Sequence, residues 1–379
     1  MAQQTKASMV KQKIKDWITE GTVSPGEKIY SENELVKLFQ VSRHTVRQAV
    51  GDLVHEGWLY REQGAGTFVA NRPNQAQMNP MRSAGKNIGV ITTYISDYIF
   101  PSIIKGIESY LSSHGYSLTF ACTDNDPEKE KQCLEAMLNR NIDGLIVEPT
   151  RSSSYNPNLH YYLEMEQNKI PYLMINQYYP QLNPPNIILN DEKGGFIATD
   201  HLIKLGHKKI IGLFKRDDIQ GLNRMQGFIR AFRENQIPFF PEMIVTFTTE
   251  EKETGLLHKL KHLLMSKDDR PTGIICYNDE IAINVLNVLR ELEIKVPEDL
   301  SIVGYDDSYL AEASEIKITS VTHPKMEMGV EAAKWIVAAV ENSDNKLVEN
   351  RQKIYEPELV IRNSTSSLKE IHPMINQEI

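Results

Sequence analysis

Two basic side chains near the start of the chain have a spacing that suits nucleic acid. Arg43 and Arg47 are four residues apart, so on a helix they share one face, and His44 projects from the same side. A guanidinium on that face can bond guanine bidentately in the major groove or clamp a phosphate. The spacing therefore indicates a DNA-reading helix, with an ordinary solvated basic face as the alternative interpretation.

A second group of polar residues lies where predicted strands end or helices begin. Its members come from the local sequences VEP, RMQGF, YNDEIA and VGYDD and are Glu148, Arg224, Asn278 and Asp306. In open α/β sheets, ligands bind outside the carboxyl ends of the strands. Carboxylates accept hydroxyl hydrogens, arginine donates in a fork, and an aromatic face of Tyr98 or Phe100 can cover C–H surface. The group predicts a polyhydroxylated ligand, although Asn278 alone is also explained as a helix cap.

Other patterns argue against catalysis and metal binding. His258 and His262 are four apart in HKLKH, but this segment lacks the glutamate of a metalloprotease and contains two lysines that would repel a cation. No GxSxG, Walker A or GxGxxG motif follows a strand, and the three cysteines form no CxxC pair. The acidic pair Asp306 and Asp307 has no catalytic base or nucleophile elbow to work with. We expect no enzyme activity, no cofactor, no metal, and reduced thiols that serve as small core residues.

The basic pair requires a small domain to position it. Helical patterns cover residues 8–20, 31–39 and the stretch from Ser42 to a stop at Gly57, and short strands follow at 58–61 and 67–69. Ser31 and Glu34 can form a capping box, and Ser42 can cap the next helix. Helix, helix, tight turn, helix and hairpin is the order of a winged helix-turn-helix, which we predict over residues 1–71.

The turn of the hairpin offers a second set of contacts with DNA. Gly64 and Gly66 would let backbone amides approach a phosphate or the minor groove closely. Gln63 and Thr67 can donate hydrogen bonds beside them. A plain hairpin turn is the alternative interpretation.

The rest of the chain has the alternation of a parallel α/β fold. Residues 72–86 are polar and aperiodic and are predicted to be a linker. Strands are predicted at 88–93, 117–122, 144–147, 172–175, 209–214, 243–247, 273–276 and 301–305, and helices near 100–113, 127–140, 191–205, 220–235, 252–264, 278–292 and 324–341. Apolar strands with crossover helices imply parallel sheets covered on both faces. Residues 87–368 are too many for one sheet, so two lobes are expected.

Composition and charge are consistent with this organisation. The chain has 379 residues, of which 41% are hydrophobic and 24% charged, which excludes a mainly disordered or fibrous protein. No apolar run approaches the ~18–20 residues of a membrane span, and lysines at the start argue against a secretion signal. We expect a cytoplasmic protein without a membrane partner. The net charge is −8, yet residues 1–72 hold ten Lys and Arg against eight Asp and Glu, so the basic excess lies at the DNA-reading end.

The first part of the chain resembles the winged-helix domain of GntR-family bacterial regulators. The segment SENELVKLFQVSRHTVRQAVGDLVHEGWLYREQGAGTFV, Ser31–Val69, carries the VSRxTVRxA core and the GxGTF wing. The resemblance implies that operator DNA is contacted by Glu32, Arg43, Thr45, Arg47, Gly64, Gly66 and Thr67. The chain departs from the family at Gln40, where a turn glycine is usual, and at Ile29-Tyr30, where Leu-Pro is common. A positive φ at Gln40 would carry some strain.

The second part resembles the effector domain of LacI/GalR-type regulators, which have a periplasmic-binding-protein fold of two lobes. The match spans about Lys86–Ile361 and rests on IGVITTYISDYIFPSIIKGIE, HLIKLGHKKIIGLF, RMQGF, YNDEIA and VPEDLSIVGYDDS. By position, it implies effector contacts from Tyr98, Phe100, Glu148, Asn176, Arg224, Asn278 and Asp306. The usual Asn-Pro-Phe is Asp97-Tyr98-Ile99 here, and the usual Asp-Arg is Asn176-Gln177.

A GntR-type head on a LacI/GalR-type body is similar to the family of arabinose-responsive repressors of Gram-positive bacteria. That likeness, and not the residue chemistry, implies L-arabinose as the monosaccharide effector. We therefore expect a multi-domain α/β repressor that binds operator DNA as a homodimer, with the helices at 100–113 and 278–292 as candidate dimer surfaces. Sugar binding would close the lobes and either change the spacing of the heads or loosen them. The alternative is a sugar-binding or transport component whose N-terminal region is only structural.

Overall fold

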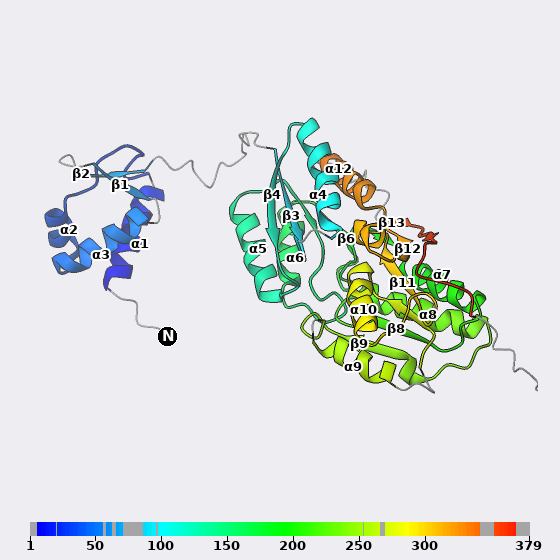
Figure 1. Ribbon diagram of the computed structural model, residues 1–379. Helices are drawn as coiled ribbons and strands as arrows, with labels where there is room; N and C mark the ends of the chain where they lie inside the picture. Colours follow the sequence, from blue (N-terminus) through cyan, green and yellow to red (C-terminus); the bar gives the residue numbers. More distant parts are fainter. Residues whose placement is uncertain are drawn as a thin grey trace, which may run out of the picture. The chain divides into compact units, whose positions relative to one another are not determined.

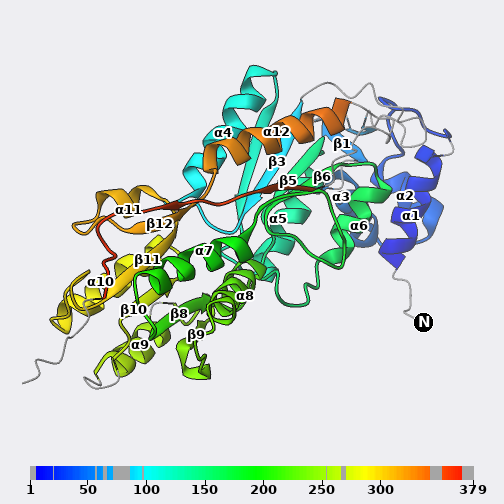
Figure 2. The ribbon, with the colours of Figure 1, turned by 90° about the vertical axis from the view of Figure 1, so that its right-hand side faces the viewer.

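Two compact units make up the chain. They are the head, Met1–Ala84, and the body, Gly85–Ile379, and we describe each by itself (Figure 1; Figure 2). The computed structural model describes residues 6–19, 21–55, 58–62, 66–70, 86–95, 98–252, 254–265, 270–341 and 352–368. The predicted linker lies outside the described residues except for Lys86, so its character stays a prediction.

The described part of the head has helices followed by a hairpin. Its elements are α1 (Lys6–Thr19), α2 (Glu32–Phe39), α3 (Arg43–His55), β1 (Leu59–Glu62) and β2 (Gly66–Val69), and the two strands pair antiparallel. Val10 and Ile14 of α1, Leu35 of α2, and Val46 and Leu53 of α3 form a common buried core. The order and the core confirm the predicted winged helix-turn-helix fold. The expected stop at Gly57 lies outside the described residues.

Local interactions define the two ends of α2. The Ser31 hydroxyl accepts from the Glu34 amide, and the Glu34 carboxylate accepts from the Ser31 amide at 2.7 Å, which is the predicted capping box. The Ser31 hydroxyl also donates to the Glu34 carboxylate at 2.7 Å, and this bond and the one from the Ser31 amide lower the pKa of Glu34. Gln40 ends α2 in the left-handed region, with φ 51°. The residue where the chain departs from the family glycine therefore adopts the conformation that glycine accommodates best.

The body consists of two lobes, each built on a six-stranded sheet in its described residues. The N-lobe sheet has the order β13 (Gln352–Tyr355), β7 (Asn186–Leu189), β6 (Tyr172–Asn176), β5 (Gly144–Val147), β3 (Asn87–Thr92) and β4 (Ser117–Cys122). The C-lobe sheet has the order β14 (Leu359–Val360), β12 (Thr319–Thr322), β11 (Ser301–Asp306), β10 (Gly273–Cys276), β8 (Ile210–Lys215) and β9 (Ile244–Phe247). All strand pairs are parallel except β12 with β14. The expected pair of parallel lobes is confirmed, although β7, β12, β13 and β14 were not predicted.

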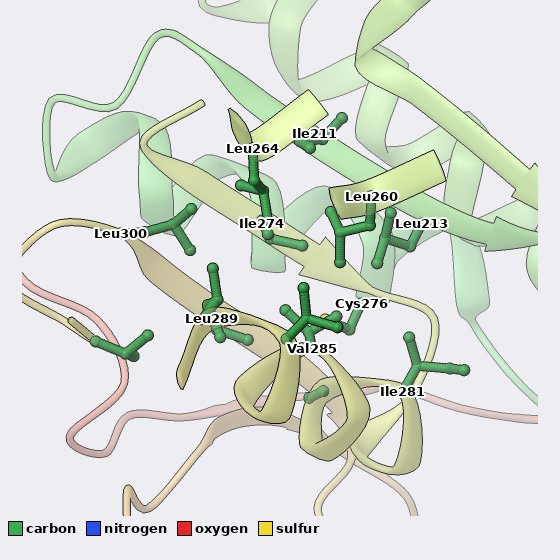
Figure 3. Close-up of a cluster of buried hydrophobic side chains, with 14 of the residues drawn as sticks. Ile211, Leu213, Leu260, Leu264, Ile274, Cys276, Ile281, Val285, Leu289 and Leu300 are labelled. Carbon is green, nitrogen blue, oxygen red and sulfur yellow. The ribbon is translucent and has the colours of Figure 1, made fainter. Parts of the chain in front are cut away.

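Helices cover both faces of each sheet. The N-lobe helices are α4 (Phe100–Ser113) and α12 (Lys325–Glu341) on one face, and α5 (Pro127–Asn139) and α6 (Leu159–Gln167) on the other. The C-lobe helices are α9 (Gly255–Met265) and α10 (Asp279–Glu291) on one face, and α7 (Asp191–Lys204) and α8 (Ile219–Glu234) on the other, with the short α11 (Tyr309–Ala313) and the 3₁₀ turn Pro241–Met243 in connections. Figure 3 shows α9 and α10 packing on β8 and β10, with Cys276 among the apolar side chains. Cys276 is thus the small core residue that was expected, whereas Cys122 and Cys133 are half-buried free thiols.

The described chain passes between the lobes at three adjacent connections. β7 ends at Leu189 and α7 begins at Asp191, β12 ends at Thr322 and α12 begins at Lys325, and β13 and β14 are joined by residues 356–358. The amide of Thr322 donates to the Glu358 carbonyl at 2.8 Å, and Asn190 donates to the Glu356 carboxylate at 3.1 Å. These bonds tie the three connections together, so the connections lie side by side and can serve as a common hinge.

Helices α4 and α12 lie side by side at very short range (Figure 1; Figure 2). A Cβ atom on Gly106 would come within 2.4 Å of the Met326 carbonyl oxygen, and one on Gly329 within 2.2 Å of the Ile103 carbonyl oxygen. Each glycine therefore allows the backbone of the other helix to approach. This contact joins α12, which begins at the hinge, firmly to the N-lobe.

Replacing Gly106 with alanine should separate the two helices, because a methyl group there has no space. We expect the Gly106→Ala variant to lose about 1–3 kcal/mol of unfolding free energy, the usual cost of overpacking. Urea unfolding of the full chain measures it, with Glu108→Ala on the exposed side of α4 as the control. Equal stability of the two variants would contradict the close approach.

Candidate functional site

The predicted DNA-reading residues form an exposed cluster on the head. Ser42 caps α3, with its hydroxyl accepting from the Thr45 amide at 3.2 Å. Arg43 and Arg47 are exposed, and both place Nε near the same oxygen of Glu32, at 3.5 and 2.9 Å. His44 is also exposed on this surface. Glu32 therefore holds the two guanidinium groups side by side, and its own contact with DNA remains a prediction.

The wing is only partly described. Gln63 and Gly64 lie outside the described residues, so their predicted contacts are untested. Gly66 has φ 131° and lies against the Lys28 side chain, where a Cβ would come within 2.4 Å of Lys28 Cε. The carbonyl of Thr67 accepts from the Ile29 amide at 2.9 Å. The segment before α2 thus supports the second strand of the wing and brings another lysine to it.

A cavity of about 200 Å³ lies between the N-lobe and the C-lobe. This is smaller than the roughly 300–1,000 Å³ typical of drug-sized ligands, so it suits a small molecule. Six of the seven predicted effector residues line it: Tyr98, Phe100, Glu148, Arg224, Asn278 and Asp306. The seventh, Asn176, lies outside the cavity wall. The position of the cavity at the carboxyl ends of the strands agrees with the sequence reasoning.

Arg224 is held by the protein from several sides. Its Nε donates to Asp191 at 2.8 Å, Nη1 donates to the Tyr277 carbonyl at 2.7 Å, and its guanidinium stacks on the Tyr305 ring at 3.6 Å. Burial would lower the pKa of Arg224, but Asp191 and Asp306 outweigh it and raise that pKa. Burial also raises the pKa of Asp191 to about 6, against the influence of Arg224. The cavity therefore contains a rigid, permanently charged guanidinium.

Glu148 is connected to the hinge through Asn176. One carboxylate oxygen of Glu148 accepts from Thr93, from the amide at 3.0 Å and from the hydroxyl at 2.5 Å, and the other accepts from Asn176 Nδ2 at 2.9 Å. Asn176 Oδ1 lies 3.0 Å from Nε2 of His323, which is in the connection between β12 and α12. Burial raises the pKa of Glu148, although the bonds from Thr93 and Asn176 oppose it. Asn176 therefore positions a cavity carboxylate instead of lining the cavity.

Tyr98 crosses from the N-lobe to the C-lobe. Its hydroxyl donates to Asp306 Oδ2 at 2.5 Å and accepts from the Asp279 amide at 3.2 Å. Asp306 itself has a left-handed backbone, with φ 89°, and its Oδ1 is buried without a hydrogen-bond partner among the described residues. Asn278 caps α10, since Oδ1 accepts from the Ile281 amide at 2.9 Å. Asn278 is therefore a helix cap, as the alternative interpretation held, and it also lines the cavity.

Further bonds join the lobes at the rim of the cavity. Asn125 of the N-lobe donates to Asp217 of the C-lobe at 3.3 Å and to Thr249 at 2.7 Å. Ser152 accepts from the Ile219 amide at 2.9 Å. Together with Tyr98, these contacts hold the body in a closed arrangement.

Sequence reasoning missed several residues that line the cavity, among them Tyr94, Asn125, Gln177, Lys215, Asp218, Lys252, Tyr277 and Glu280. Lys215 is the last residue of β8, and Asp218 caps α8 by accepting from the Gly221 amide at 2.7 Å. The rule about the carboxyl ends of strands could have identified both. Gln177 directly follows β6, so the same rule applies to it.

The described residues contain neither a cluster of metal-ligating side chains nor a membrane-spanning helix. His258 and His262 are exposed on α9, and no cluster of three or more potential metal ligands occurs in the described ranges. None of the helices described is both long and apolar enough to cross a bilayer.

Both the head and the body match known protein families. The head matches the gntR family of bacterial regulatory proteins over residues 6–69, and the body matches a periplasmic binding protein-like domain over residues 199–365. An arabinose metabolism transcriptional repressor of Halalkalibacterium halodurans is 54% identical over 97% of this chain and 98% of its own length. One of the same description from Geobacillus stearothermophilus is 47% identical over 95% of this chain and 97% of its own length. A solved LacI family transcriptional regulator from Enterococcus faecium with bound ribose is 25% identical, with a TM-score of 0.64, over 75% of this chain and all of that one.

The buried histidine at the hinge should make stability depend on pH. Burial lowers the pKa of His323 from 6.5 to about 4. Its contribution to stability is present above pH 6.5 and is lost as the pH falls toward 4, because only the unfolded chain takes up the proton readily. From pH 7 to pH 5, wild type should lose about 2 kcal/mol more unfolding free energy than His323→Gln. Urea titrations at both pH values measure this, and parallel losses would contradict it.

Proposed function

The chain belongs to the family of arabinose metabolism transcriptional repressors, and we propose that L-arabinose in the cavity of the body releases the head from operator DNA. It is a DNA-binding repressor with a GntR-type head and a LacI-like body, and it is not an enzyme. The observation that carries the proposal is the cavity between the lobes, which charged side chains from both lobes line. The alternative of a transport component has no support, because relatives of nearly the full length are named as repressors.

The charges around the cavity favour a neutral ligand. The described lining residues include the cations Lys215, Arg224 and Lys252 and the carboxylates Glu148, Asp218, Glu280 and Asp306. The carboxylates outnumber the cations, so an anionic ligand would be buried without compensation. A neutral polyol can both donate to carboxylate oxygens and accept from cations. The bound ribose in the Enterococcus faecium regulator supports a pentose in a cavity of this fold.

Closure of the lobes gives the sugar a way to act at a distance. A ligand that touches both lobes binds the closed form more tightly and shifts the population toward it. A tenfold loss of operator affinity requires about 1.4 kcal/mol of coupling. We propose that two copies act in the cytoplasm as a twofold dimer on a near-palindromic operator, and that closure changes the spacing of their heads or loosens them.

Removing the guanidinium of Arg43 should separate DNA binding from sugar binding. We expect Arg43→Ala to weaken binding to a duplex selected by the wild-type protein by about 1–3 kcal/mol, because a bidentate base contact is lost. Fluorescence anisotropy measures the duplex affinity, and calorimetry should show unchanged L-arabinose affinity. Lys13→Ala, on the exposed side of α1, is the control. Loss of both affinities would indicate a damaged fold, and loss of neither would remove Arg43 from the interface.

A panel of sugars tests whether the cavity prefers a neutral ligand of pentose size. In calorimetric titrations of the full chain, L-arabinose should bind more tightly than D-ribose, D-xylose and D-glucose. D-ribose 5-phosphate should bind more weakly than D-ribose, because its charge would meet the excess of carboxylates. Tightest binding of the phosphate ester or of the hexose would refute the effector assignment.

A further inference from the structure

Three cations line the described part of the cavity, and they differ in how fully the protein already uses them. Arg224 donates to Asp191 and to the Tyr277 carbonyl and is covered by two aromatic rings. Lys252 pairs with Glu280 at 2.5 Å. Arg224 therefore has its donors engaged within the protein, and Lys252 is exposed enough for water to satisfy its remaining donors.

Lys215 differs because its ammonium keeps donors to spare. The residue is 7% exposed and lines the cavity from the end of β8. Within the described ranges its ammonium makes ion pairs with Asp218 Oδ2 at 3.1 Å and Asp217 Oδ1 at 3.6 Å, and no additional hydrogen bond. An ammonium has three N–H donors. A buried N–H donor that lacks an acceptor costs free energy, because it has lost its hydrogen bond with water. A ligand oxygen in the cavity would satisfy what the protein leaves open.

The neighbours of Lys215 hold it in a fixed position. Asp218 is anchored as the cap of α8 and also accepts from the Tyr277 hydroxyl at 2.7 Å. Asp217 accepts through its other oxygen from Thr249, at 3.0 Å from the amide and 2.7 Å from the hydroxyl. Burial alone would lower the pKa of Lys215, but Asp218, Tyr94 and Asp217 raise it, so the ammonium stays charged. The side chain is thus presented to the cavity as a preorganised donor.

A matching acceptor lies elsewhere in the cavity wall. Asp306 Oδ1 is buried, and its nearest cation is Arg224 Nη2 at 3.6 Å, beyond hydrogen-bonding distance. A ligand that satisfies both groups must offer an oxygen to Lys215 and a hydroxyl hydrogen to Asp306. A polyol has both.

We propose that Lys215 is a specificity-determining residue, whose ammonium donates to one oxygen of the bound sugar while another hydroxyl of that sugar donates to Asp306 Oδ1. This proposal rests on the function proposed above and adds a contact that neither the sequence motifs nor the family resemblance assigned.

The direct test is calorimetry of L-arabinose with the full-length Lys215→Met variant. Loss of one charge-assisted hydrogen bond should weaken sugar binding by about 10- to 100-fold. The control is Lys261→Met in the same lobe, which removes a partly exposed lysine paired with Glu291 and should change affinity by less than about threefold. Lys252→Met should lose less than Lys215→Met. An equal or larger loss for Lys252→Met would overturn the assignment.

Monodeoxy derivatives of L-arabinose identify the contacted oxygen. If Lys215 donates to a given oxygen, deleting that oxygen weakens binding to wild type but costs nothing further in Lys215→Met. Additive losses for every derivative would overturn the contact. If Lys215→Met fails to fold, Lys215→Arg keeps the charge beside Asp218 and moves the donors, so it should lose affinity for L-arabinose by about tenfold or more. Unchanged affinity and unchanged order of preference among pentoses would contradict the proposal.

Different results would refute the proposed function and the role of Lys215. Wild-type protein that binds no pentose would refute the proposed function. Wild-type protein that binds L-arabinose, beside a Lys215→Met variant that binds it equally well, would refute only the role of Lys215.

Discussion

Charged groups buried between two lobes must find partners, and this constraint determines how the body is built. Removing an ion from water costs several kcal/mol unless an opposite charge or hydrogen bonds replace the water. Arg224 meets this requirement within the C-lobe through Asp191, and Glu148 meets it within the N-lobe through Thr93 and Asn176. Asp306 meets it only in part, through a hydroxyl from the opposite lobe. The buried groups that still lack hydrogen-bond partners determine which ligand the cavity can accept.

The same residues connect the cavity to the hinge. Asn176 joins Glu148 to His323, and the ammonium of Lys325, at the start of α12, donates to the Asp306 carbonyl at 2.6 Å and to the Asp307 carbonyl at 2.9 Å. Helix α12 packs closely on α4 in the N-lobe, with glycines at the contact. A carboxylate that lines the cavity is therefore two contacts away from the connection between β12 and α12. This proximity gives a physical reason why occupancy of the cavity can bias closure.

Local sequence determines the elements that could be predicted. The capping box of Ser31 and Glu34 needs residues three apart, and the apolar strands of both lobes are bounded by polar turns, so both are visible in a short window. The four edge-side strands β7, β12, β13 and β14 were missed because pairing over long distances defines them. β13 pairs with β7, for example, across more than 160 residues. A four-residue strand such as TSVT in β12 has no period of its own strong enough to reveal it.

In the candidate site, too, local sequence identifies some residues, and long-range contacts decide the role of others. Glu148 and Asp306 could be identified because strand ends converge in a parallel sheet, and Arg224 because it lies near the start of a predicted helix. Asn176 also ends a strand, but a contact with His323, 147 residues further on, places it behind Glu148. Lys215 was missed although it ends β8, because an apolar run followed by a lysine resembles an ordinary strand boundary. The acceptors that surround a cavity cation come from other elements. A local sequence pattern therefore cannot show which cation keeps N–H donors free.

The thermodynamic coupling that we propose between the head and the cavity must be reciprocal. If sugar weakens the binding of DNA by some factor, DNA must weaken the binding of sugar by the same factor. The most direct measurement is calorimetric titration of L-arabinose into the free full-length protein and into its complex with a selected duplex. Our account predicts at least about tenfold weaker sugar binding to the complex, equal to the loss of duplex affinity at saturating sugar. Equal sugar affinities in the two titrations would contradict it.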